Sequence, residues 1–189
     1  QYLLDQVEQV WWKFFNADRR KALSDQLETS IYQLLISSSI TDEERKPLYN
    51  SYVRVASTEA AQRVIYKIWN DKIKVKGVKI DESDYIGLAY ELAVRGFGNT
   101  DSILTAQEQR IKNTDRKAKF KFIRRAVSAD LNVRDSFFAS LSDVANRRPE
   151  AWVTEALRYL NHPLRTNTSI KYLKPSLDFL PEIQKTGDI

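Results

Sequence analysis

The chain has 189 residues, with 30 basic and 25 acidic side chains and a formal net charge of +5. Its 42% hydrophobic and 29% charged residues are typical of a globular protein, and only 5 glycines and 5 prolines argue against an all-β fold. The absence of cysteine excludes disulfides and thiolate ligands, and no apolar run reaches the roughly 18–20 residues that span a bilayer.

The first part of the chain carries apolar residues at helical spacing. A Thr41-Asp42-Glu43-Glu44 capping box predicts a helix that runs to about Val55. Residues 73–80 alternate as a strand would, but they contain Gly77 and have no second strand to pair with, so we interpret them as an extended loop. Three further helical stripes are expected, formed by Leu3, Leu4, Val7, Val10, Trp11, Phe14 and Phe15, by Leu23, Leu27, Ile31, Leu34 and Leu35, and by Ala60, Ala61, Val64, Ile65, Ile68 and Trp69.

The second part repeats this pattern. Acidic residues at 81–84 favour a helix start, and Gly96 and Gly98 stand where its C-cap is expected. Pro149 suits a first helical position, and the Pro after His162 should end that helix. A final helix is expected from near Thr168, with Pro175 kinking or restarting it. Further stripes are formed by Ile103, Gln107 and Ile111, by Ala118, Phe120, Phe122, Ile123, Ala126 and Val127, and by Phe137, Phe138, Leu141, Val144 and Ala145.

The predicted fold is therefore all-α, with about nine or ten helices joined by short connections. Helix starts recur in pairs about 35–40 residues apart, close to the size of a HEAT unit. We interpret residues 1–189 as a single helical domain, an irregular α-solenoid of HEAT- or armadillo-like antiparallel helix pairs, although no repeat in sequence is legible.

No catalytic, cofactor-binding or metal-binding residue is predicted. A zinc peptidase site needs two histidines, a general-base Glu and a third ligand, whereas His162 is the only histidine. A Ser-His-Asp triad around His162 is the alternative; we favour a structural role, as a helix C-terminal cap or a packed imidazole. Asp42, Glu43 and Glu44 are better explained as helix-start electrostatics than as metal ligands.

Half of the positions in residues 110–125 are basic. They could bind an anionic partner such as nucleic acid, but the solvated face of a surface helix is the interpretation we favour, because apolar residues between them form an inward stripe. The basic residues are Arg110, Lys112, Arg116, Lys117, Lys119, Lys121, Arg124 and Arg125.

Two smaller groups of residues could also mark a site. Trp11, Trp69 and Trp152 lie on apolar stripes and are predicted to pack in the core, whereas Trp12 lies off its stripe and is the candidate interface residue. At the junction before Pro149, we expect either Arg147 or Arg148 to bind helix C-terminal carbonyls and the other to be solvated.

Several segments carry a resemblance to a known family. DESDYIGLAYELAVRG, ILTAQEQRIKN, DRKAKFKFI, NVRDSFFASL, NRRPEAWVTEALRYLNHPLR and YLKPSLDFLPEIQKTGDI follow one another over residues 81–189. Together they resemble the C-terminal HEAT-like helical domain of bacterial zinc aminopeptidases of the aminopeptidase N type, a gluzincin metallopeptidase family. Over residues 1–72 only helical character matches. In these relatives two Phe and a Pro usually follow the TGDI motif, so the resemblance implies a piece of a larger protein.

The resemblance implies that the parent enzyme removes N-terminal residues from peptides with a zinc-bound water. Its zinc would lie in a catalytic domain outside this chain, and this domain would be a non-enzymatic part that closes the chamber and restricts peptide access. Its partners would be the catalytic domain of the same polypeptide and the peptide substrate, in a soluble protein of the bacterial cytoplasm or cell envelope. The alternative is a freestanding α-solenoid that binds protein or nucleic acid.

Overall fold

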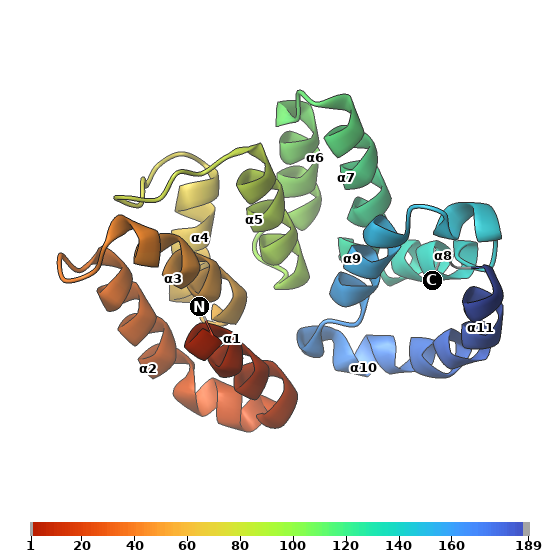
Figure 1. Cartoon of the computed structure of the whole chain (residues 1–189), viewed down its shortest axis with the longest axis horizontal. Coiled ribbons are helices and arrows are strands. Elements are labelled where there is room, and N and C mark those ends of the chain that lie inside the picture. The colour runs from red at the N-terminus through yellow and green to blue at the C-terminus, as the bar shows by residue number, and fades with distance from the viewer. Residues whose placement is uncertain (1, 187–189) are drawn as a thin grey trace. The chain divides into compact units, whose positions relative to one another are not determined.

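The structure is a computed structural model that describes the backbone of residues 2–186 and the side chains of residues 2–181. Within these residues every regular element is helical and no strand occurs, which confirms the predicted all-α class (Figure 1). The chain forms two compact units that divide between Phe97 and Gly98. No helix of residues 2–186 is both long and apolar enough to cross a bilayer.

The first unit is built around α3. Both α1 and α2 pack on α3, and α5 packs on α4 and also touches α3. The helices alternate with short connections, apart from the loop between α4 and α5, which confirms the interpretation of residues 73–80 as an extended loop. The elements are α1 (Tyr2–Gln9), the π-helical turn η1 (Val10–Phe14), α2 (Ala17–Ile36), α3 (Asp42–Val55), α4 (Glu59–Trp69) and α5 (Glu82–Val94).

Helix ends in this unit follow the predicted capping signals. Thr41 and Glu44 form a reciprocal capping box, and α3 ends at Val55 as the sequence indicated. Asp81 and Asp84 form a second box at the start of α5. After α5 the chain turns at Gly96, whose φ of +70° is the left-handed conformation that glycine adopts without steric cost.

In the second unit α7 occupies the centre. It packs on α6, α8 and α9, and Phe120 and Ile123 on its inward side are fully buried. Ala118, which was expected on the same inward stripe, is exposed because it falls outside the arc that these neighbours cover. The elements are α6 (Thr100–Arg110), α7 (Thr114–Val127), α8 (Leu131–Ser140), η2 (Val144–Arg147), α9 (Glu150–Leu160), η3 (Pro163–Arg165), α10 (Thr166–Ser169), η4 (Ile170–Tyr172) and α11 (Leu173–Thr186).

The last elements differ in detail from the prediction. The stripe expected to continue to Val144 is interrupted, because α8 ends at Ser140 and Val144 lies exposed in a 3₁₀ turn. Instead of one helix from near Thr168, a short helix and a 3₁₀ turn precede α11. Pro175 lies in the first turn of α11, where a missing N–H costs no intrahelical bond. Residues 187–189 of the terminal motif lie outside the described residues.

Buried arginines hold helix C-termini in both units. Arg45 donates to the carbonyl oxygens of Leu35, in the last turn of α2, and of its C-cap Ser37, at 2.5 and 2.7 Å. Arg165 reaches the end of α7, where it donates to the carbonyls of Ala126 at 2.9 Å and Val127 at 2.7 Å. These guanidinium groups satisfy carbonyls that a helix end leaves without an intrahelical donor. These arginines therefore stabilise the contact between neighbouring helices, and we assign them no role in a functional site.

Candidate docking surface

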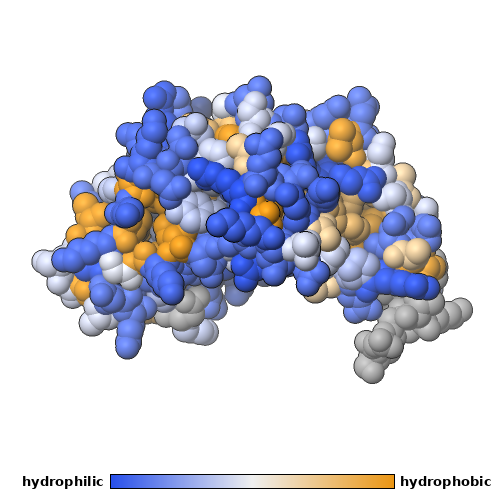
Figure 2. Space-filling model, turned by 90° about the horizontal axis from the view of Figure 1, so that it is seen from above, coloured by the Kyte–Doolittle hydropathy of each residue, from blue (hydrophilic) through white to orange (hydrophobic). Residues whose placement is uncertain are grey.

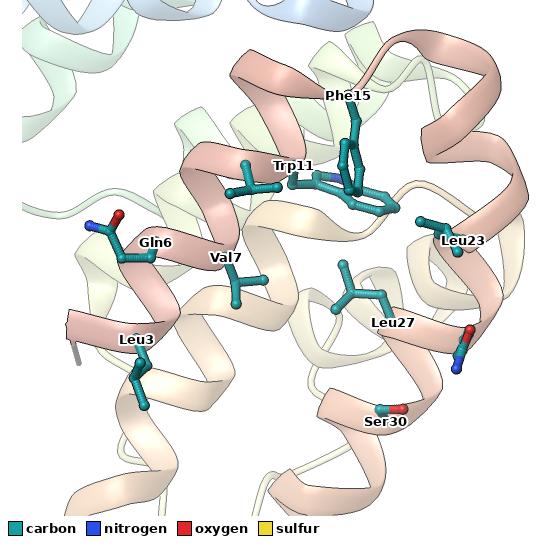
Figure 3. A pocket seen from close by; sticks show the side chains of 10 residues that line it. Leu3, Gln6, Val7, Trp11, Phe15, Leu23, Leu27 and Ser30 are labelled. Carbon is teal, nitrogen blue, oxygen red and sulfur yellow. The ribbon is translucent and has the colours of Figure 1, made fainter.

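A cavity in the first unit lies between α1 and α2. Its volume is about 690 Å³. Figure 3 shows Trp11 and Phe15 at the end where η1 turns toward α2, with Val7 and Leu27 projecting from opposite walls. We call this cavity the α1–α2 groove; it is lined by Leu3, Gln6, Val7, Val10, Trp11, Phe15, Leu23, Gln26, Leu27 and Ser30.

The groove exists because α2 carries apolar residues on more than one side. Ile31 and Leu35 are buried on the side that packs on α3. Leu23 and Leu27 lie on a different side of the same helix and remain half-buried at the groove wall. Since α1 also packs on α3, both helices share this support, and a strip of apolar surface is left open between them.

The closed end of the groove is fixed by local structure. The π turn at residues 10–14 brings Trp11 into the interior, where 2% of it is exposed and its ring lies 6.1 Å from that of Phe15 in an edge-to-face arrangement. Asn16 then caps α2 by accepting from the Arg19 amide at 2.8 Å. The indole N–H of Trp11 is buried and has no hydrogen-bond partner among the described groups.

The first predicted stripe is therefore only partly a core stripe. Trp11 is buried as expected, but Leu3 and Phe14 are each 77% exposed, and Val7 and Val10 are 37% and 41% exposed. The predicted stripe is thus helical, but only part of it is buried. The periodicity itself marked the groove wall; the sequence alone could not reveal that the wall is uncovered.

The groove is electrically neutral. None of its lining residues is ionisable; its polar groups are the amides of Gln6 and Gln26 and the hydroxyl of Ser30. The nearby acid Glu8 is paired with Arg54 at 3.0 Å. A surface of this composition offers burial of apolar area rather than charge chemistry.

Glu28, which follows the groove residue Leu27, is turned toward α4 and is 4% exposed. Its carboxylate accepts from the backbone N–H groups of Ser57 and Thr58 and from the Thr58 hydroxyl, at the start of α4. Burial raises the pKa of Glu28, and the hydrogen bonds from Thr58 and Ser57 oppose that effect. The carboxylate has a structural task and does not belong to the groove.

A second apolar surface belongs to the other unit. Four large side chains from η4 and α11 recur at helical spacing and stay exposed: Ile170 at 61%, Leu173 at 54%, Leu177 at 63% and Leu180 at 45%. Apolar patches also interrupt the hydrophilic surface in Figure 2. Contiguous exposed apolar surface of this kind is a mark of interaction sites.

Some cations of the basic stretch form ion pairs with acids of neighbouring helices. Arg124 binds Asp101 at 2.8 Å and Glu108 at 2.9 Å, both on α6. Lys119 binds Glu155 of α9 at 2.6 Å. These ion pairs link α7 to its neighbours and neutralise part of the positive charge. Phe120, which could stack on a base only if exposed, is fully buried.

His162 has a structural setting. It is 7% exposed, and its Nδ1 accepts from the Leu164 amide at 3.2 Å. The histidine thus caps the start of η3. One of the two roles expected from the sequence was a cap at the end of the preceding helix. Among the described residues no group of three or more His, Cys, Asp or Glu side chains is placed to hold a metal ion.

The remaining candidates have mixed outcomes. Trp69 is buried, but Trp152 is only half-buried, because one side of it lies open while its ring meets Phe122 at 6.0 Å. Trp12 is half-buried, and the Arg20 guanidinium lies over its ring at 5.2 Å. Its role at an interface stays a prediction.

The arginine pair before Pro149 behaves as expected. Arg147 donates to the carbonyls of Leu141, at 2.5 Å, and Ser142, at 3.2 Å, just past the end of α8. Arg148 is exposed. The sequence prediction that one arginine binds helix C-terminal carbonyls and the other is solvated is confirmed.

Comparisons of the chain with protein-family models, with curated proteins and with solved structures find no match.

Proposed function

We propose that this chain is the non-catalytic C-terminal helical domain of a zinc-dependent aminopeptidase, and that it closes the catalytic chamber of the parent enzyme and restricts peptide access. In this proposal the two helical units belong to one irregular α-solenoid, and the parent's zinc is bound by its catalytic domain. The domain supplies shape and contact surface, while the bonds of the peptide are broken elsewhere in the parent enzyme.

The observation that carries the docking role is the neutral, apolar α1–α2 groove of about 690 Å³. Burial of such a surface stabilises an interface by roughly 25 cal/mol per Å² of apolar area removed from water. The identity of the parent is supported by the resemblance over residues 81–189. The motifs that carry it lie in order along the helices from α5 to α11.

The proposal is tested first on the isolated chain. Aminoacyl p-nitroanilides should not be hydrolysed with or without added zinc, and zinc should be lost on dialysis against a chelator. The chain has one histidine and no cysteine, and its described residues bring no three His, Cys, Asp or Glu side chains together as ligands. Stoichiometric zinc that survives dialysis, or zinc-dependent hydrolysis, would overturn the assignment.

The second test is genetic. The coding sequence that surrounds this segment should contain an HExxH motif and a downstream glutamate ligand, since these build a gluzincin zinc site. A complete gene without this motif would refute the aminopeptidase assignment and favour the second candidate.

The second candidate is a freestanding α-solenoid that binds another protein. The exposed side chains of Ile170, Leu173, Leu177 and Leu180 favour this class over a nucleic-acid binder, because an apolar surface gains nothing from contact with phosphates. Nucleic acid is the less favoured partner for a second reason, which is the pairing of Arg124 and Lys119 with acids of neighbouring helices.

A further inference from the structure

We infer that Gly98 is a hinge, at which the two helical units of this chain reorient as separate bodies. The units divide between Phe97 and Gly98. The hinge is independent of the proposed function, because it rests on the backbone geometry of this connection and on the packing within each unit.

The chain before the hinge is held by the first unit. α5 ends in a Schellman motif, in which the Gly96 N–H donates to the Ala93 carbonyl at 3.1 Å. The Phe97 N–H donates to the Leu92 carbonyl, also at 3.1 Å. The ring of Phe97 lies 5.4 Å from that of Tyr66 on α4. Because both its backbone and its side chain are held, Phe97 moves with the first unit.

The chain after the hinge is held by the second unit. Asn99 is the N-cap of α6, and its side chain accepts from the Ser102 amide at 3.0 Å. Its carbonyl accepts from the Ile103 amide at 3.2 Å. Thr100, the first residue of α6, is 7% exposed. A capping residue that is bonded in both ways moves with its helix, so one residue alone separates it from Phe97.

That residue, Gly98, is the one with conformational freedom. Its φ of +56° lies in the left-handed region, and glycine populates positive and negative φ about equally well. The residue is exposed, and a Cβ added to it would meet no heavy atom within 4 Å beyond its chain neighbours. Among the residues that the structure describes, no hydrogen bond involves its backbone. Neither packing nor hydrogen bonding therefore selects one conformation of Gly98.

Each unit has a buried core of its own. Ile65 and Leu88 are buried in the first unit, and Phe120 and Ile123 are buried in the second. Hinges in proteins are a few loop or element-terminal residues that absorb large changes in φ and ψ while the packed bodies on either side stay intact. Rotation at Gly98 would change the angle between the two units without loss of packing in either. It would let the units adjust to a partner that contacts both.

The test measures distances between spin labels. Because the chain has no cysteine, labels attach only at introduced ones. Gln33→Cys on α2 and Ala118→Cys on α7 lie at exposed positions, one in each unit. Gln33→Cys with Ala60→Cys, both exposed in the first unit, gives the reference width for a rigid pair. Double electron–electron resonance on the full chain should show a distance distribution between units at least about twice as wide as the reference.

Glycine variants locate the hinge. Gly98→Ala should narrow the distribution between units, because a Cβ disfavours the conformations with positive φ. Gly98→Asn should retain more of the native width, since Asn adopts the left-handed conformation more readily than Ala. Gly96→Ala is the matched control: Gly96 also has a positive φ and open space around an added Cβ, but it precedes the anchored Phe97. This control should leave the distribution between units unchanged, and far-UV circular dichroism checks that each variant is folded.

A distribution between units as narrow as the reference would overturn the inference, because a single orientation needs no hinge. An unchanged distribution in Gly98→Ala would also overturn it. Equal effects of Gly98→Ala and Gly96→Ala would do the same, because the rotation would then not be confined to Gly98. These readouts are separate from the hydrolysis and coding-sequence tests, so failure of the hinge and failure of the aminopeptidase assignment can be distinguished.

Discussion

Glu28 offers a sharp test of how the first unit is held together. It is 4% exposed and serves three donors at the start of α4: the backbone N–H groups of Ser57 and Thr58 and the Thr58 hydroxyl. Glu28→Ala leaves all three without this acceptor. An orphaned buried donor costs about 1–3 kcal/mol. Since Ser57 and Thr58 are half-buried and water can reach part of the site, we expect a total loss of about 3 kcal/mol.

Glu28→Gln should cost far less, about 1 kcal/mol or under, because the side-chain carbonyl still accepts and the charge that burial disfavours is gone. The pKa of Glu28 is raised above its ordinary value of 4.5, chiefly by burial. A raised carboxyl pKa makes the folded state bind the proton more tightly than the unfolded chain does. Stability from this group is therefore fully present below about pH 4.5 and lost as pH rises through the folded pKa.

The assay is urea unfolding of each variant, followed by far-UV circular dichroism at pH 7 and at pH 4.5. Relative to Glu28→Gln, the native protein should gain stability on acidification. Asp25→Asn is the matched control, since Asp25 is an exposed carboxylate on the same helix, and should change stability by less than about 0.5 kcal/mol. If Gln costs as much as Ala, or if the gain in acid is absent, the account of a desolvated acceptor is wrong.

Three further predictions concern the second unit and the tryptophans. Arg165→Met should lower the free energy of unfolding in urea by about 3 kcal/mol, because it leaves the carbonyl groups at the end of α7 without this donor. The exposed control Arg148→Met should lower it by less than about 0.5 kcal/mol. Equal losses would contradict the carbonyl-binding role. Trp69→Ala should lose about 3–5 kcal/mol and half-buried Trp152→Ala clearly less, so the reverse order would show that burial is misassigned. Filter binding at two salt concentrations should show only weak, salt-sensitive binding of DNA through residues 110–125; tight binding at physiological salt would refute the ion-pair argument.

Burial of one arginine also changes its ionisation. Burial, followed by the charge of neighbouring Arg134, lowers the pKa of Arg165 to about 10. The carbonyl oxygens of Ala126 and Val127 stabilise the cation there by accepting hydrogen bonds from its N–H groups. This arrangement accommodates Arg165, which is 8% exposed, at the end of α7.

The sequence determined the elements whose causes are local. The Thr41–Glu44 capping box set the start of α3, and Pro163 ended α9. Apolar periodicity located the buried Trp69 and Phe120. All three signals act over a few residues. Short-range signals of this kind can be read directly from one chain. The same reasoning predicted that one arginine before Pro149 binds backbone carbonyls, and Arg147 is that residue.

Only the tertiary structure decided which apolar stripes are covered. Leu3 and Phe14 carry the same periodic signal as Trp11, yet they are exposed, because coverage depends on helices distant in sequence. The same dependence made Trp152 half-buried and took Arg45 and Arg165 to helix ends that lie 8–39 residues away along the chain. The α1–α2 groove belongs to this class: periodicity supplies its walls, and the separate packing of α1 and α2 on α3 leaves it open.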